Sequence, residues 1–113
     1  MEIINNNNFK SLYSTKAYKK NQIIIKLSGT ILDKPTRTSI EIGKDKHIED
    51  ELGQYMNHSF QPTCKIENGC VIALHDIEKG TELNFNYNES ETKMACPFVD
   101  KTTNKMVSGG KND

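Results

Sequence analysis

The sequence predicts a mostly β domain with little helix. Several short segments rich in β-branched and aromatic residues follow one another at close spacing, and turn residues separate them. The pair Asn68 and Gly69, between two apolar segments, is the strongest hairpin signal, because Asn-Gly supplies the two positive φ angles of a type I′ turn. A chain of 113 residues has room for one domain. We therefore expect one domain built from several small sheets.

The first half of the chain is expected to contain most of the strands. The polar run at residues 5–8 predicts a loop or frayed end before them. The consecutive isoleucines at residues 23–25 favour a strand buried on both faces. Strict alternation around Ile40 and Ile42 places these two side chains on one face of a further strand and Glu41 on the other. The expected strands of this half lie at residues 9–15, 22–27, 30–32, 38–42 and 47–48.

The second half contains the only segment with helical spacing, residues 49–56, which Gly53 keeps short. The Asn-Gly hairpin follows, and its register sets Glu67 opposite Cys70 and Cys64 opposite Ala73, so a bond between the two cysteines is disfavoured. Residues 82–87 alternate apolar and polar as a last strand, and beyond them the chain is polar apart from residues 94–99. We expect order around Phe98 and disorder after it.

Composition excludes several classes of function. Fifteen basic residues balance fifteen acidic ones, which gives no bulk attraction to nucleic acid or to an anionic membrane. The N-terminus lacks the regions of a signal peptide, and no apolar run approaches the ~18 residues of a membrane span. Three cysteines without a Cys-x-x-Cys pair fit a reducing compartment and no metal site. The hydrophobic share of 35% predicts a thin core, which a ligand or a second subunit in a homodimer would stabilise.

The polar residues have ordinary interpretations when each is taken alone. Asn57, His58 and Ser59 form a polar segment that would cap a helical turn or bind local backbone. Tyr87 at a strand end is by default a half-buried aromatic. No pair of histidines has metal-ligand spacing, and no Ser-His-Asp or Cys-His arrangement indicates a hydrolase.

Taken together, these segments resemble a known family. The pattern Tyr-Met-Asn-His-Ser-x-x-Pro at residues 55–62, a hairpin, and Ala-Leu-x-Asp-Ile-x-x-Gly-x-Glu-Leu-x-Phe-x-Tyr at residues 73–87 closely resembles the C-terminal half of the SET domain of protein-lysine methyltransferases. Residues 12–24 and 38–48 are similar to the opening and middle strands of short, free-standing microbial or viral SET proteins. The resemblance divides the chain into a flexible N-terminus, a SET domain, a short segment like the one that follows SET domains, and a disordered tail: residues 1–8, 9–90, 91–99 and 100–113.

The resemblance implies a β-clip-like fold of curved sheets in which the Asn-His-Ser segment passes beneath the loop that ends at Tyr87, in a pseudoknot-like crossing. It implies S-adenosylmethionine as cofactor, methyl transfer to a lysine of a protein or peptide, and Tyr87 as the catalytic residue at the pore where the lysine nitrogen meets the methyl group. No metal is implied. The residues implied to bind the cofactor are Lys10, Ser11, Leu12 and Tyr13 through their backbone, Asn57, His58, and Phe98 against the adenine.

Five features depart from the family pattern. The usual Gly-x-Gly at the start of the domain is Phe9-Lys10-Ser11, and a frequent second channel tyrosine is Thr38. A usual Cys is Phe60, the Asn that commonly follows the Pro of the motif is Thr63, and of the cysteines that often follow the domain only Cys96 is present. Residues 71–83 also resemble SAF domains, which are small β-clip modules, so a weak or inactive SET-like or SAF-like binding module is the alternative to an enzyme. In either case we expect an intracellular protein, cytoplasmic or in the host cell if the chain is viral, with no direct nucleic-acid or membrane partner.

Overall fold

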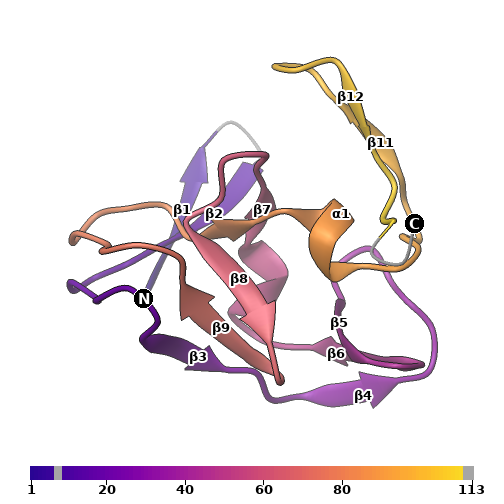
Figure 1. Ribbon diagram of the computed structural model, residues 1–113, viewed down its shortest axis with the longest axis horizontal. Coiled ribbons are helices and arrows are strands. Elements are labelled where there is room, and N and C mark those ends of the chain that lie inside the picture. Colours follow the sequence, from indigo (N-terminus) through magenta and orange to yellow (C-terminus); the bar gives the residue numbers. More distant parts are fainter. Residues whose placement is uncertain (7–8, 111–113) are drawn as a thin grey trace.

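Short strands dominate the computed structural model, which describes residues 1–6 and 9–110 (Figure 1). Within these residues twelve strands form five small sheets, and the helical segments are one 3₁₀ turn and one α-helical turn. No helix in this part of the chain is long and apolar enough to cross a membrane. The predicted fold class, several small sheets with little helix, is confirmed.

The Asn-Gly hairpin lies in a three-stranded sheet of order β3-β9-β8. Strands β8 (Cys64–Glu67) and β9 (Cys70–Ala73) pair with the predicted register, and Asn68 and Gly69 have φ angles of 51° and 74°. The third strand, β3 (Ile23–Lys26), was expected to be buried on both faces, and this is wrong. It lies at the edge of the sheet, where the core covers it only in part, so Ile23 is 46% exposed.

A second three-stranded sheet has the order β4-β6-β5 and confirms the strands expected in the middle of the chain. Its strands are β4 (Thr30–Leu32), β5 (Ile40–Gly43) and β6 (Lys46–Glu49). The 3₁₀ turn η1 (Gly53–Tyr55) follows, and the buried carboxylate of Asp50 accepts hydrogen bonds from the backbone N–H groups of Ser28, Leu52 and Gly53 at 2.7–2.9 Å. A Cβ at Gly53 would lie 3.0 Å from the side chain of Ile40, so a glycine lets this turn approach β5.

Strand structure begins earlier than predicted. Residues Glu2–Asn6 form β1, which pairs antiparallel with β2 (Phe9–Tyr13), whereas a loop or flexible end was expected. The ladder to β2 satisfies the backbone of β1, although Ile3 and Ile4 remain exposed. Asn7 and Asn8, which belong to the same expectation, lie outside the described residues.

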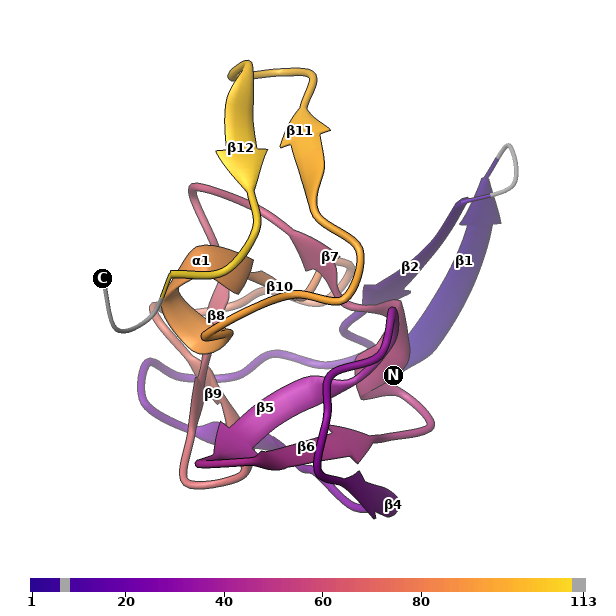
Figure 2. The same cartoon turned by 90° about the vertical axis from the view of Figure 1, so that its right-hand side faces the viewer.

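The C-terminal part also departs from expectation. The last strand ends early as β10 (Asn84–Phe85), because the side chain of Asn86 accepts a hydrogen bond from the backbone N–H of Asn88 and so caps helix α1 (Tyr87–Ser90). Strands β11 (Phe98–Asp100) and β12 (Lys105–Val107) then pair as a hairpin within the tail that was expected to be disordered. Residues 111–113 of that tail lie outside the described part of the chain. Figure 2 shows this hairpin extending away from the body of the domain.

A parallel strand pair joins the two parts of the motif that the sequence singled out. Strand β7 (Asn57–His58) pairs with β10, with Asn57 beside Asn84 and His58 beside Phe85. Ser59 N–H continues the pairing by donating to the carbonyl of Phe85 at 3.1 Å. The two segments therefore lie side by side, and we call this pair of strands, with the residues that flank it, the crossing. Its residues Met56, Leu83 and Phe85 are buried in the core.

Candidate functional site

Tyr87 stands at the crossing and is held from both ends. Its hydroxyl donates to the backbone carbonyl of Met56 at 2.5 Å, and its own backbone N–H donates to Nδ1 of His58 at 3.1 Å. Its ring packs at centroid distances of 4.8 Å from Phe85 and 5.2 Å from His58. The phenol is therefore fixed in position by backbone and side-chain contacts.

The phenol of Tyr87 stays protonated. Burial raises its pKa well above the usual value of a tyrosine, and the carboxylates of Glu91 and Glu82 raise it further. A neutral hydroxyl that already donates its proton to a carbonyl retains lone pairs that can accept a hydrogen bond. This geometry suits the orientation of an N–H group and does not suit a base.

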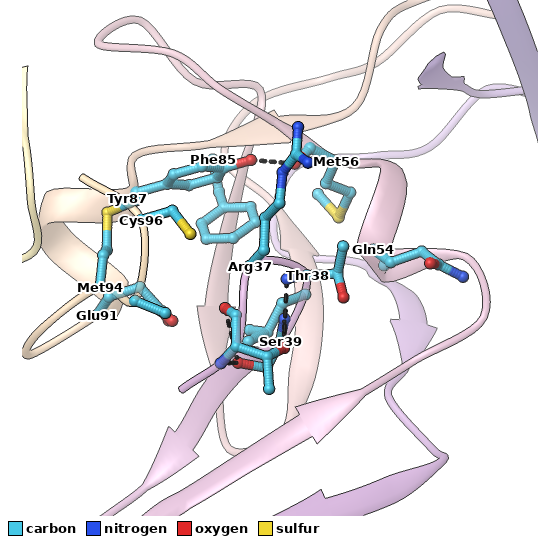
Figure 3. Close-up of a pocket in the computed structure, with 14 residues that line it drawn as sticks. Arg37, Thr38, Ser39, Gln54, Met56, Phe85, Tyr87, Glu91, Met94 and Cys96 are labelled. Atoms are coloured by element: carbon cyan, nitrogen blue, oxygen red, sulfur yellow. Dashed lines mark hydrogen bonds between the residues drawn. The ribbon is translucent and has the colours of Figure 1, made fainter. Parts of the chain in front are cut away.

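A small cavity of about 40 Å³ lies beside Tyr87 (Figure 3). Met56, Phe85 and Tyr87 line one side of it, and the segment before β5 lines the opposite side. On that opposite side the hydroxyl of Thr38 bonds to the carboxylate of Glu49 at 2.9–3.0 Å. Its walls also include Arg37, Ser39, Ile40, Gln54, Glu91, Met94, Ala95 and Cys96. The side formed by Met56, Phe85 and Tyr87 is apolar apart from the phenol, and it suits a slim aliphatic chain that ends in a polar group.

His58 presents an unused hydrogen-bond donor. Because Nδ1 accepts from the backbone N–H of Tyr87, the neutral ring carries its proton on Nε2. That nitrogen is buried and has no hydrogen-bond partner among the described residues. Burial lowers the pKa of His58, and the nearby carboxylate of Asp100 opposes this only in part. A buried N–H without an acceptor among the described residues is available to a ligand or to a water molecule, as is Nδ1 of the buried His47.

Aromatic side chains gather around His58. The centroid of its ring lies 4.4 Å from Phe60 and 6.1 Å from Phe98, and Phe98 lies 6.2 Å from Tyr87. Phe98 is 41% exposed, and the ammonium group of Lys105 lies 5.3 Å from the centre of the Phe60 ring. The hairpin thus brings a partly exposed ring beside the residues of the crossing, where it can stack on a flat ligand.

Asn57 connects the crossing to β2. Its amide nitrogen donates to the hydroxyl of Ser11 at 2.9 Å and to the carboxylate of Glu82 at 3.1 Å. Both amide hydrogens are therefore bound to protein atoms. In this structure Asn57 orients β7 against the neighbouring strand and against residue 82.

The remaining predicted residues lie along β2. Leu12 is 0% exposed and its carbonyl accepts from the backbone N–H of Leu83 at 2.8 Å, so its side chain belongs to the core. Tyr13 is half-buried and forms a β-bridge with Glu82, and the ammonium of Lys10 lies 5.4 Å from the centre of the Tyr55 ring. The structure thus brings together Ser11, Asn57, His58, Tyr87 and Phe98. The contribution of β2 to cofactor binding stays a prediction.

Several contributors to the site were not predicted. The carbonyl of Met56 has no signal in a sequence, because any residue supplies one. Phe60 stands two residues after His58 in a motif that drew attention to its polar members. Glu41, which is buried, accepts hydrogen bonds from the backbone and hydroxyl of Thr92 at 3.0 and 2.8 Å and thereby attaches the segment after α1. Among the described residues no group of three or more His, Cys, Asp or Glu side chains could hold a metal ion.

A family model covers more than half of this chain. The sequence model of the SET domain matches residues 10–88. The histone-lysine N-methyltransferase ASHH2 of Arabidopsis thaliana is 40% identical over 52 residues, which cover 39% of this chain and 3% of that protein. The chain thus spans a small fraction of the length of this curated relative.

A solved structure supports the fold. The chain resembles a chain in the structure of a humanized mutant of the Chaetomium thermophilum Polycomb Repressive Complex 2 bound to the inhibitor GSK126, with a TM-score of 0.55 and 17% identity. The match covers 89% of this chain and 17% of the other. At this identity it is evidence for the fold alone.

Proposed function

This chain belongs to the SET-domain family, and on that premise we propose that it transfers a methyl group from S-adenosylmethionine to a lysine side chain of a protein or peptide. The observation that carries the proposal is the fixed, neutral phenol of Tyr87 beside a small cavity with one apolar side and next to His58. A methyl transfer by in-line displacement needs a correctly placed, uncharged amine more than it needs a base.

The cavity beside Tyr87 can supply both requirements. A free lysine has a pKa of ~10.4; the apolar side formed by Met56 and Phe85 disfavours its charged form, as the positive sulfur of a bound cofactor would, and both act against the carboxylate of Glu91 in the same lining. The hydroxyl oxygen of Tyr87 can accept a hydrogen bond from the lysine N–H and so direct the nitrogen lone pair along the pore. Tyr87 acts by orientation in this scheme, which agrees with its raised pKa.

The residues around His58 fit the cofactor. The buried Nε2–H of His58 can donate to an acceptor on it, and the partly exposed ring of Phe98 can stack on the adenine. When bound, S-adenosylmethionine supplies the methyl group on a positively charged sulfur. The chain supplies the hydrogen-bond donor of His58, the aromatic wall at Phe98 and the pore at Tyr87.

The curated relative supports a protein as the substrate, since it carries the name of a histone-lysine methyltransferase. We therefore propose a lysine on a histone or another protein as the acceptor, with no direct role for nucleic acid or membrane. We place the activity inside the cell, or in a host cell if the chain is of the viral type, and we extend the proposal to a homodimer because the core is thin.

One observation favours a second candidate, a SET-like or SAF-like module that binds without turnover. Both amide hydrogens of Asn57 are bound to Ser11 and Glu82, and one edge of β2 is paired with β1. These donors are therefore not free for a cofactor in this structure. Cofactor binding with no methyl transfer to lysine would select this candidate.

Calorimetry with S-adenosylmethionine on the purified chain tests the proposal. We expect binding by the wild type and about tenfold weaker binding by Asn57→Ala, because the loss of two hydrogen bonds frees β7 from β2. Gln61→Ala, which removes an exposed amide four positions along, is the matched control and should bind as the wild type does. No heat of binding with the wild-type chain would overturn the proposed methyltransferase.

A further inference from the structure

The hairpin β11–β12 needs an anchor to hold a fixed position. It is a separate two-stranded sheet, and a lone two-stranded hairpin is only marginally stable in water. On its outward face Val99 and Met106 are 46% and 56% exposed, so burial on that face does not hold it. The stabilising contacts must come from its inward face and its base.

The base of the hairpin is attached to α1 mainly through one side chain, Asn88. The amide nitrogen of Asn88 donates to the carbonyl of Met106 at 3.2 Å, and its amide oxygen accepts from the backbone N–H groups of Ser108 and Gly109 at 3.1 and 3.0 Å. The backbone N–H of Met94 donates to the carbonyl of Ser108 at 3.0 Å. A single amide thus binds three backbone groups within residues 106–109, and a second backbone hydrogen bond, from the N–H of Gly110 to the carbonyl of Glu91 at 2.9 Å, lies beside the one from Met94.

Two further features show that this attachment is tight. Val107, between the residues that Asn88 binds, is 0% exposed. Gly109 has a φ of +95°, and a Cβ built there would lie 2.9 Å from the carbonyl oxygens of Glu91 and Thr92. The chain can therefore approach this closely only with glycine at position 109.

Because of the register of the hairpin, the attachment at β12 also fixes the position of Phe98 at the site. Phe98 pairs with Val107, so the two side chains point to the same face, toward the domain. On that face the ring of Phe98 lies 6.1 Å from His58 and 6.2 Å from Tyr87. Asn88 follows Tyr87 directly in α1, and one helical turn therefore holds both the phenol of the pore and the base of the hairpin.

We propose that Asn88 is a positioning residue for the cofactor site: by binding the base of β12 it fixes Phe98 against His58 and Tyr87 and so keeps the aromatic wall in place. This inference rests on the proposed function and adds a residue that acts on cofactor binding through Phe98. Without Asn88 the hairpin samples detached positions. The apparent affinity for the cofactor then falls in proportion to the fraction of molecules in which the aromatic wall is in place.

The test is a double-mutant cycle on binding of S-adenosylmethionine, measured by calorimetry on the full chain. We expect Asn88→Ala to weaken binding about tenfold, while adding Asn88→Ala to Phe98→Ala weakens it less than about twofold, because Asn88 acts through that ring. Asn88→Asp keeps the oxygen that accepts from Ser108 and Gly109, and should stay within about threefold of the wild type. Lys101→Ala, an exposed truncation in the turn between β11 and β12, is the matched control and should bind normally.

A second measurement separates this inference from the function on which it rests. Hydrogen exchange of residues 98–107 should be faster in Asn88→Ala than in the wild type, with or without cofactor. The thermal midpoints of the two proteins should stay close to each other. Unchanged exchange, or equal affinity of Asn88→Ala and the wild type, would overturn the positioning role and leave the proposed function standing. No binding by the wild type would overturn the proposed function, and with it the role of Asn88 at a cofactor site.

Discussion

Replacement of Tyr87 by phenylalanine removes one hydroxyl and little else. The ring retains its contacts with Phe85 and His58, and the backbone N–H still donates to Nδ1 of His58. What is lost is the 2.5 Å hydrogen bond to the carbonyl of Met56 and the oxygen that faces the cavity. Binding of the cofactor should therefore stay within about twofold of the wild type, since the wall around His58 is unchanged.

The magnitude of the effect on turnover follows from the role assigned to the oxygen. A reacting nitrogen that is misplaced by about 1 Å loses on the order of 100-fold in rate, so we expect kcat of Tyr87→Phe to fall about 100-fold. The effect on stability is smaller. One lost hydrogen bond and one unsatisfied carbonyl at the buried Met56 cost about 1–2 kcal/mol, which lowers the thermal midpoint by roughly 5–10 °C.

The assay is transfer of a labelled methyl group to lysine at saturating cofactor, well below the thermal midpoint of the variant. Tyr18→Phe is the matched control, because Tyr18 is also buried and lies beside Ile77, on a different bridge of the fold. If Tyr87→Phe turned over as fast as the wild type, the pore would not lie at Tyr87. If it failed to bind cofactor, the separation of orientation from binding would be wrong.

Two further perturbations test the supports of the site. Burial lowers the pKa of His58 in the folded protein, so the stability that its neutral ring contributes is complete above pH ~6.5 and is lost as the pH falls through the lowered folded pKa. Urea midpoints at pH 7.5 and 5.5 should therefore differ more in the wild type than in His58→Asn, and an equal difference in the two proteins would contradict the assignment. Asp50→Ala should lower the free energy of unfolding, measured by urea denaturation, by about 3 kcal/mol, because three backbone N–H groups lose a charged acceptor. The control Asp33→Ala, at an exposed position, should change it by less than about 0.5 kcal/mol, and an equally small cost for Asp50→Ala would show that the carboxylate does not hold the turn.

The parts of the fold that local chemistry determines could be predicted from the sequence. The Asn-Gly pair fixed both the turn and the register of β8 and β9, down to Glu67 opposite Cys70. The strand around Ile40 followed from alternation, and the strand around Ile48 from the turn before it. In each case the signal lies within a few residues of the element, so no knowledge of distant partners was needed.

The parts that depend on distant partners could not be predicted in this way. Strand β1 and the hairpin β11–β12 are polar or exposed over much of their length and exist because a ladder satisfies their backbone, which composition does not reveal. The exposure of Ile23 depends on its edge position in the sheet. The same holds for the site: the resemblance named Tyr87, but its acceptor is a backbone carbonyl at Met56, and the role of Asn88 appears only once the hairpin is in place.

The most direct test of the central claim is the chemical identity of the methylated product. The wild-type chain is incubated with S-adenosylmethionine labelled in the methyl group and a pool of proteins that includes histones, and the labelled protein is hydrolysed to amino acids. We predict that the label is recovered as N-methylated lysine and that Tyr87→Phe reduces it by about 100-fold. Absence of labelled lysine with a wild-type chain that binds the cofactor would contradict the claim that this domain is a lysine methyltransferase.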